Sequence, residues 1–248
     1  MAELMRHGSL AQSSHQQIAR ALGSEILAGV YPPGTTLPNE TALLSRFHIS
    51  RTVLREVIKT LTAKGLVVAK TRIGTRVLDP AHWNFFDAEV LSWKVGLGMD
   101  DAFRQSLVEV RRSIEPAAAA LAAQRRTAED LAALRACIAA MADPAHTRES
   151  FAEADRDFHL RVGAASGNPL MRSLAGVIET ALIASFSLSS PTGAPDLQAG
   201  AVEAHRAIVD AIENQDAKGA ELAMLAVIDV GHERVESYLA DSRRPGSN

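Results

Sequence analysis

From Asp100 to the end of the chain, apolar residues recur at helical spacing, and no alternating pattern typical of strands interrupts them. Breaks that contain proline or glycine divide this stretch at 143–144, 167–169 and 190–195. The expected helices are 100–125, 127–142, 147–165, 169–189, 197–213 and 216–240. The sequence therefore predicts an all-α bundle over residues 100–241, followed by a frayed tail at 242–248.

The N-terminal part of the chain has a different pattern, with three shorter helices. A helical apolar stripe over 15–28 ends at Gly29, a residue that commonly terminates helices. A second helix is expected to begin at Pro38, because proline is favoured in the first helical turn. Ser50 is a good N-cap for a third helix that runs to about Ala63.

Two short apolar strands, 66–69 and 75–78, follow the third helix and flank a basic tip at 70–74. Three helices and such a hairpin predict a winged helix-turn-helix domain over 1–79. The outer face of the third helix carries cationic and hydrogen-bonding side chains, namely Arg51, Thr52, Arg55 and Lys59. A recognition helix needs such residues to reach bases and phosphates, so this face predicts binding to double-stranded DNA. The alternative is a generic small domain with a solvated basic face.

The charge of the chain is divided unevenly between its two parts. The net charge is −3, yet residues 1–79 contain ten Lys or Arg and only five Asp or Glu, which gives +5. The remainder therefore carries −8. This asymmetry indicates a module that faces a polyanion, joined to a module with another task.

Neither a membrane span nor a signal peptide is expected. No apolar run approaches the ~20 residues needed to cross a bilayer, and Met1–Ser14 is polar. The lone Cys137 has no cysteine in the same chain with which to form a disulfide. These features predict a cytoplasmic protein without a membrane partner.

An aromatic segment separates the two modules. Both tryptophans, Trp83 and Trp93, lie in it together with Phe85 and Phe86. We expect residues 80–99 to form an amphipathic linker helix whose aromatic rings dock one domain on the other. Stacking on nucleic acid is less favoured because few basic residues interleave the rings.

One group of residues in the bundle has the chemistry of a metal site. Asp155 and His159 are four residues apart, so their side chains share one helical face, and His205 stands two helices later. A carboxylate and two imidazoles on facing helices can bind a divalent ion such as zinc, nickel or manganese. The alternative is a hydrogen-bonded Asp–His pair on the surface.

The N-terminal motifs resemble the DNA-binding domain of the GntR superfamily. The resemblance lies in Ile26–Gly34, Leu37–Glu40, Ile49–Glu56, Gly65–Val67 and Gly74–Val77, and so covers nearly all of 15–78. It implies that the DNA-facing residues are Glu40, Ser50, Arg51, Thr52, Arg55, Lys59, Arg72 and Gly74. A basic residue often follows the glutamate of the second helix in this family, whereas this chain has Thr41.

The C-terminal motifs resemble the FCD effector domain of the FadR-type branch of that superfamily. They are Arg111–Ala117, Asp155–His159, Ala165–Pro169 and Glu203–Ile212. The resemblance implies that Asp155, His159 and His205 occupy three of the four places that hold metal in the branch. Val227 stands at the fourth place, and His232, five residues further on, is a poor substitute. Three outcomes stay open: three protein ligands plus the effector, weak binding, or no metal.

The same resemblance implies an anionic effector. Arg111 matches an inward-pointing arginine that could pair with a carboxylate, while Asp155, His159 and His205 take hydroxyls or the metal. The alternative for Arg111 is a salt bridge to Glu115 at helical spacing. A sugar acid such as galactonate or gluconate fits this chemistry.

These expectations describe a ligand-responsive transcriptional regulator that acts as a homodimer on a pseudo-palindromic operator, with repression released by the effector. One rival is a metal-dependent enzyme centred on Asp155, His159 and His205. A paired glutamate base, a nucleophile elbow and a phosphate loop are all missing from the sequence. The second rival is an architectural DNA binder that senses nothing, against which the long acidic helical part argues.

Overall fold

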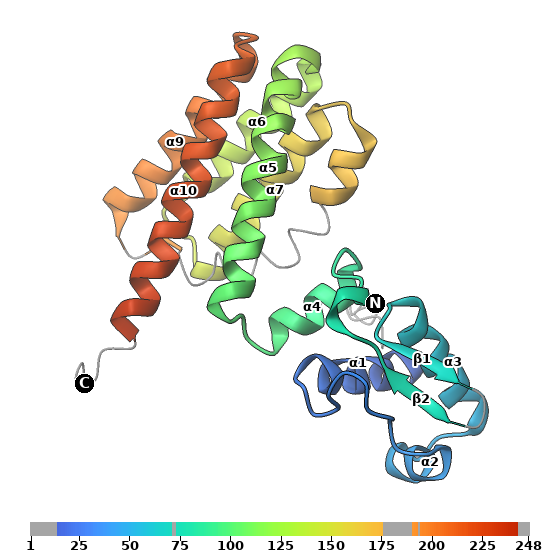
Figure 1. Ribbon diagram of the computed structural model, residues 1–248. Coiled ribbons are helices and arrows are strands. Elements are labelled where there is room, and N and C mark those ends of the chain that lie inside the picture. The colour runs from blue at the N-terminus through green and yellow to red at the C-terminus, as the bar shows by residue number, and fades with distance from the viewer. Residues whose placement is uncertain (1–13, 71–72, 176–189, 193, 243–248) are drawn as a thin grey trace, which may run out of the picture. The chain divides into compact units, whose positions relative to one another are not determined.

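The computed structural model describes residues 14–70, 73–175, 190–192 and 194–242. It divides the chain into two compact units, with the division between Gly98 and Met99 (Figure 1). Each unit is described by itself below, as the N-terminal unit and the C-terminal unit.

The N-terminal unit is a winged helix-turn-helix domain, as the sequence predicted. Its elements are α1 (Ser14–Leu27), α2 (Glu40–Phe47), α3 (Arg51–Ala63), β1 (Val67–Lys70), β2 (Gly74–Val77), η1 (Pro80–His82) and α4 (Ala88–Gly96). Helix α3 packs against α1, α2 and β1. The two strands are antiparallel, with Val67 opposite Val77 and Lys70 opposite Gly74. The core contains the predicted stripe of α1, including Leu22 and Ile26, both fully buried.

Side-chain caps set the beginnings of α2 and α3. Ser50 has extended backbone, and its hydroxyl accepts a hydrogen bond from the Val53 amide, which confirms the predicted cap. The prediction that α2 begins at Pro38 is wrong by two residues. Asn39 is the N-cap and accepts from the Ala42 amide, so the helix begins at Glu40. An asparagine cap satisfies an orphan amide, which outweighs the preference of proline for the first turn.

Residues 80–96 belong to the N-terminal unit, and of the linker helix predicted over 80–99 only Ala88–Gly96 is α-helical. After the short η1 turn, α4 packs against α1. Val90 and Trp93 lie in the N-terminal core, and Trp83 and Phe85 pack against it. Gly23 of α1 makes room for Trp93, since a Cβ there would lie 2.3 Å from the indole ring. The aromatic segment thus completes the core of the DNA-binding domain.

A buried cation joins α3 to α4. Lys64, the C-cap of α3, is 6% exposed, and its Nζ lies 2.7 Å from a carboxylate oxygen of both Asp87 and Glu89. Burial alone would lower the pKa of Lys64, but these two carboxylates raise it above its ordinary value. Burial would likewise raise the pKa of Asp87, but Lys64 and two backbone amides that donate to the carboxylate lower it. Both groups are therefore charged at neutral pH.

We expect Asp87→Asn to lower the free energy of unfolding by about 1–2 kcal/mol at pH 7. Asparagine still caps α4, so the change isolates the charge. A carboxyl whose pKa is lowered by folding stabilises the fold above its unfolded pKa of about 3.9, and that contribution disappears as pH falls. The difference from the wild type should accordingly shrink below about pH 4 in urea unfolding followed by tryptophan fluorescence. Glu89→Gln is the control, since Glu89 is exposed and its loss should cost about 0.5 kcal/mol or less. Equal costs for the two variants at pH 7 would contradict the assignment.

The turn after α3 depends on Gly65. Its φ is +73°, and a Cβ there would lie 2.1 Å from the carbonyl oxygen of His82. Gly29 has a similar φ of +77° but open space around the added carbon. Gly29→Ala should therefore cost about 1–2 kcal/mol, the penalty for the left-handed backbone alone. Gly65→Ala should cost at least ~1 kcal/mol more, because the backbone must also shift. Melting temperatures of the two variants give the comparison, and equal losses would show that the contact with His82 relaxes freely.

The C-terminal unit is an all-α bundle, as predicted. The helices that lie wholly within the described residues include α5 (Asp101–Arg125), α6 (Ala128–Met141), α7 (Arg148–Ala165), α9 (Pro195–Glu213) and α10 (Ala217–Ser242). Helix α10 packs against α5 and α9, while α7 packs against α5 and α6 (Figure 1). Phe158, Leu134, Ile208 and Met224 are fully buried in the core. Of the predicted helix 169–189, residues 169–175 are helical and 176–189 lie outside the described residues, as does the tail 243–248.

No helix within the described ranges is both long enough and apolar enough to span a membrane.

Candidate functional site

The outer face of α3 carries the predicted DNA-facing side chains. Leu54, Val57 and Leu61 are buried, and they fix the rotation of the helix about its axis. The opposite face is consequently turned to solvent. It presents exposed Arg51, Thr52, Arg55 and Lys59, with Ser50 exposed at the cap, and it also carries the exposed Glu56, whose carboxylate lies 2.8 Å from Lys59 Nζ. The amphipathic spacing of α3 thus places a cationic row on the surface.

A hollow of about 500 Å³ brings the α3 face together with the wing. Its lining includes Glu40, Arg51, Arg55, Lys59 and Gly74. Of the other predicted residues, Ser50 and Thr52 do not line it, and Arg72 lies outside the described residues. Sequence reasoning missed Ile73, an apolar wing residue that lines the hollow and is 62% exposed.

An exposed ion pair joins α2 to α3 at this hollow. Arg51 Nε lies 3.0 Å from Glu40 Oε1, and both side chains are more than half exposed. Such a pair contributes little to stability, so it is readily exchanged for a stronger anion such as a phosphate. Glu40 therefore orients the Arg51 guanidinium, which can exchange this carboxylate for a phosphate.

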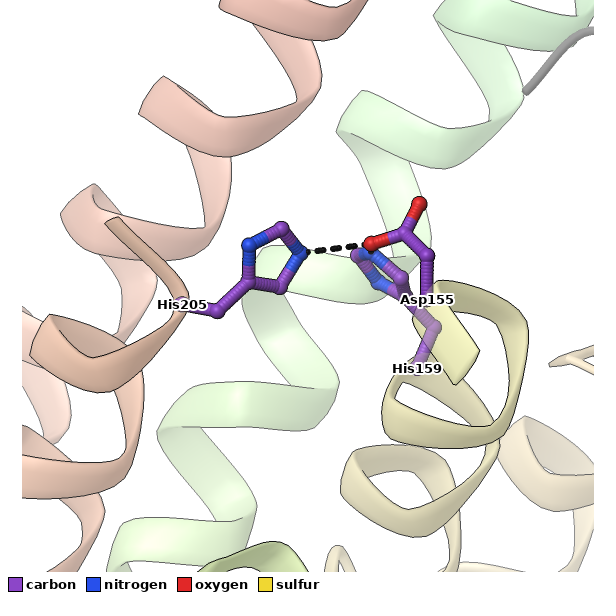
Figure 2. Close-up of side chains that lie close together, drawn as sticks. All are labelled: Asp155, His159 and His205. Atoms are coloured by element: carbon purple, nitrogen blue, oxygen red, sulfur yellow. Dashed lines mark ion pairs between the residues drawn. The ribbon is translucent and has the colours of Figure 1, made fainter. Parts of the chain in front are cut away.

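In the C-terminal unit, α7 and α9 bring three predicted side chains together. Asp155 and His159 extend from α7 toward His205 on α9, as Figure 2 shows. Asp155 Oδ1 lies 2.8 Å from His205 Nε2 and 3.8 Å from His159 Nε2. One ligand atom from each residue fits within a span of 4.8 Å, and all three residues are buried. The structure thus brings together the three side chains that the sequence analysis grouped as a candidate metal site.

Each imidazole has an acceptor close to Nδ1. His205 Nδ1 lies 2.7 Å from the Ala201 carbonyl oxygen, and His159 Nδ1 lies 2.8 Å from Glu115 Oε2. In both rings Nε2 is therefore the nitrogen that faces Asp155, where a bound metal ion would take the place of a proton. The contacts of Asp155 Oδ1 with His205 Nε2 and of Glu115 Oε2 with His159 Nδ1 are close but not aligned for hydrogen bonds. The carboxylate oxygen and the two ring nitrogens that converge here suit a divalent cation between them.

Glu115 is a residue of this site that the sequence indicated only as a possible salt-bridge partner of Arg111. Its carboxylate contacts His159 and also accepts hydrogen bonds of 2.6 Å and 3.2 Å from Arg111 Nε and Nη2. The Arg111–Glu115 salt bridge that was considered as an alternative is therefore present. The i, i+4 spacing could reveal that bridge, but not the contact with His159, which lies 44 positions away in the chain.

Both buried carboxylates of the site are ionised. Burial alone would raise the pKa of Glu115, but Arg111 and His159 lower it to about 2. Burial would also raise the pKa of Asp155, but His205, His159 and Arg111 lower it below its usual value. An ionised carboxylate and neutral imidazole nitrogens are the donors that zinc, nickel and manganese accept.

A cavity of about 210 Å³ opens beside this cluster. Arg111, Asp155 and His205 line it, and so do Val227 and Arg234 of α10. Burial lowers the pKa of Arg234 while Asp155 opposes the shift, and because the pKa of arginine starts far above neutrality the guanidinium stays charged at neutral pH. The sequence reasoning did not single out Arg234, because one arginine among several on a helix carries no distinguishing signal. An anion in this cavity would have cationic groups within reach.

Val227 stands at the place that the resemblance assigns to a fourth metal ligand, and its side chain is apolar. Val227 lines the cavity, whereas His232 lies partly exposed on α10 and is not in the cluster or in the lining. The residues present fit a divalent ion with three protein ligands, Asp155, His159 and His205. A four-coordinate ion held by these three residues would have one position left for a ligand from the cavity.

Comparisons with known proteins cover both units. Residues 14–77 match the family model for bacterial regulatory proteins of the gntR family, and residues 106–230 match that of the FCD domain. The HTH-type transcriptional regulator YieP of Escherichia coli is 38% identical over 217 residues, 85% of this chain and 90% of YieP. The galactonate operon transcriptional repressor of the same organism is 34% identical over 215 residues, 86% and 92% of the two chains. The solved structure of Lar, which controls the Listeria monocytogenes agr system, shares the fold, with a TM-score of 0.59 and 19% identity over 94% of this chain and 99% of that one.

Proposed function

Because this chain belongs to the GntR family of bacterial regulatory proteins, with an FCD domain after its DNA-binding domain, we propose that it is an operon repressor released by a sugar acid. Family membership makes the chain a DNA-binding transcriptional regulator rather than an enzyme. The observation that carries the proposal is the presence, in one chain, of an exposed basic α3 face and a buried Asp–His–His cluster with a cavity beside it. An architectural DNA binder that senses no ligand would not need this cluster and cavity.

A sugar acid matches the donors around the cavity. Its carboxylate would pair with a guanidinium, and its hydroxyls would bind the carboxylate and imidazoles or a metal held by them. The named relative that controls a galactonate operon supports this class of effector. A divalent ion bound by Asp155, His159 and His205 would act as a Lewis acid that attracts the effector's oxygen atoms.

The regulatory step is a difference in affinity. The effector would bind more tightly to a form of the protein whose DNA-binding domains fit the operator poorly, and thereby release it. A homodimer on a two-fold operator follows from the use of one recognition helix per half-site. We expect light scattering to give twice the mass of the chain. Because the target is chromosomal DNA, we place the protein in the cytoplasm.

The test is a mobility shift on the promoter fragment upstream of the protein's own gene, with random duplex as the comparison. We expect preference for the promoter, and release by galactonate or gluconate but not by galactose, which lacks the carboxylate. Treatment with a chelator should weaken the response to the acid without abolishing DNA binding. Equal binding to both duplexes at moderate ionic strength would refute the repressor, whereas promoter binding without release by any hexonate would refute only the effector class.

A further inference from the structure

We propose that Glu115 is a positioning residue of the metal centre, which orients His159 through Nδ1 and so links the centre to α5. This inference rests on the metal binding proposed above. It starts from a buried carboxylate that contacts a metal-ligand imidazole from one side and a guanidinium from the other.

The first step concerns the direction of the His159 ring. Glu115 Oε2 lies 2.8 Å from Nδ1, a close ion-pair contact that is not aligned for a hydrogen bond, and the other ring nitrogen, Nε2, faces Asp155 Oδ1 at 3.8 Å. A carboxylate this close to Nδ1 favours the tautomer with its proton there, and it makes the ring a stronger metal ligand. His205 obtains the same orientation from a backbone carbonyl, through the 2.7 Å contact of its Nδ1 with Ala201. Glu115 is thus to His159 what the Ala201 carbonyl is to His205. A substitution can remove the Glu115 carboxylate, whereas it cannot remove a backbone carbonyl.

The second step concerns Arg111, which contributes only hydrogen-bond donors. It occupies both oxygens of Glu115, with Nε 2.6 Å from Oε1 and Nη2 3.2 Å from Oε2. The ion pair is buried, with side chains 5% and 11% exposed, so the carboxylate has one fixed orientation. Arg111 therefore holds Glu115 in place, and Glu115 holds His159.

These two steps predict what an amide would do at position 115. In Glu115→Gln we expect the amide oxygen at the place of Oε1, because an NH₂ group there would oppose Arg111 Nε at 2.6 Å, whereas the longer contact of 3.2 Å with Nη2 can open. The NH₂ group then faces His159 Nδ1 and favours the tautomer with its proton on Nε2. A protonated Nε2 does not ligate a metal, so a nearly isosteric change would weaken the centre.

The test measures Zn²⁺ affinity of the full-length protein by competition with a chromophoric chelator. We expect Glu115→Gln to weaken Zn²⁺ binding by about 10- to 100-fold, the usual effect of losing an outer-shell partner. Nitrogen-15 NMR of the metal-free protein should show His159 protonated on Nδ1 in the wild type and on Nε2 in the variant. A residue with a merely structural role would not move this tautomer. Glu109→Gln is the matched control, since Glu109 is an exposed glutamate of the same helix.

If Glu115→Gln does not fold, the double variant Arg111→Met with Glu115→Met decides the matter. It replaces the buried pair with apolar side chains, which proteins often tolerate, and leaves Nδ1 of His159 without its carboxylate. A similar loss of Zn²⁺ affinity supports the proposal. If whichever of these two variants folds binds Zn²⁺ within twofold of the wild-type affinity, the role proposed for Glu115 is overturned. The metal site itself is not affected by that result. A wild-type protein that binds no Zn²⁺ overturns both.

Discussion

Arg55→Ala should weaken binding to the operator by about 10- to 100-fold. Arg55 is exposed on the outer face of α3 and lines the hollow next to the wing, and an arginine that contacts a base or phosphate contributes about 1–3 kcal/mol. Fluorescence anisotropy against salt concentration distinguishes the two kinds of contact. A phosphate contact lowers the salt slope by about one and weakens all duplexes alike, whereas a base contact reduces the preference for the operator.

Arg20→Ala is the control for this experiment. Arg20 is exposed on α1 in the same unit and does not line the hollow, so the variant loses the same charge from a different surface. It should bind the operator within about threefold of the wild type, the size of a screened long-range charge effect. Operator binding that Arg55→Ala leaves unchanged, or that both variants reduce equally, would remove α3 as the recognition helix.

Asp155→Asn should abolish the response to the effector while leaving operator binding intact. The carboxylate is buried at the centre of the Asp–His–His cluster, and asparagine keeps its shape but loses the charge that attracts a cation. Loss of an outer-shell partner reduces metal affinity by up to about 100-fold. Loss of a direct ligand such as Asp155 should therefore reduce Zn²⁺ affinity by more than that. Because the α3 face lies in the other unit, the variant should remain on the operator in the presence of galactonate. In cells it would behave as a repressor that no longer releases.

His232→Ala is the matched control, and it also tests the fourth metal place. His232 lies on α10 outside the cluster and outside the lining of the cavity, so its loss should leave Zn²⁺ affinity unchanged. A loss similar to that of Asp155→Asn would show that α10 turns in solution to supply the fourth ligand. Release of Asp155→Asn from the operator at the wild-type concentration of effector would instead place the effector elsewhere.

Local sequence rules were sufficient for most of the fold, because caps and apolar stripes act within one or two helical turns. Ser50 begins α3, and the buried stripe of α1 faces the core, as the spacing indicated. The beginning of α2 was misplaced because two adjacent residues, Pro38 and Asn39, both favour a helix start, and only the cap hydrogen bond distinguishes them. The pattern also could not show that Trp93 fills a space left by Gly23, since that contact joins positions 70 apart.

The candidate site was predictable only in part, for the same physical reason. Asp155 and His159 share a helical face, so their spacing alone suggested a pair. The approach of His205 to that pair depends on how α9 packs beside α7, which no local pattern encodes. Glu115 was visible only as a partner of Arg111, and its contact with His159 arises from the packing of α5 against α7.

The packing of α4 on α1 determines where the chain can be cut for engineering. A chimaera joined after Asp79 would remove Val90 and Trp93 from the core of the DNA-binding domain and leave a hole beside Gly23. A junction at Gly98 keeps that core whole and starts the transplanted partner at the Asp100 cap of α5. Biosensors that exchange effector domains within this family should therefore be joined at Gly98.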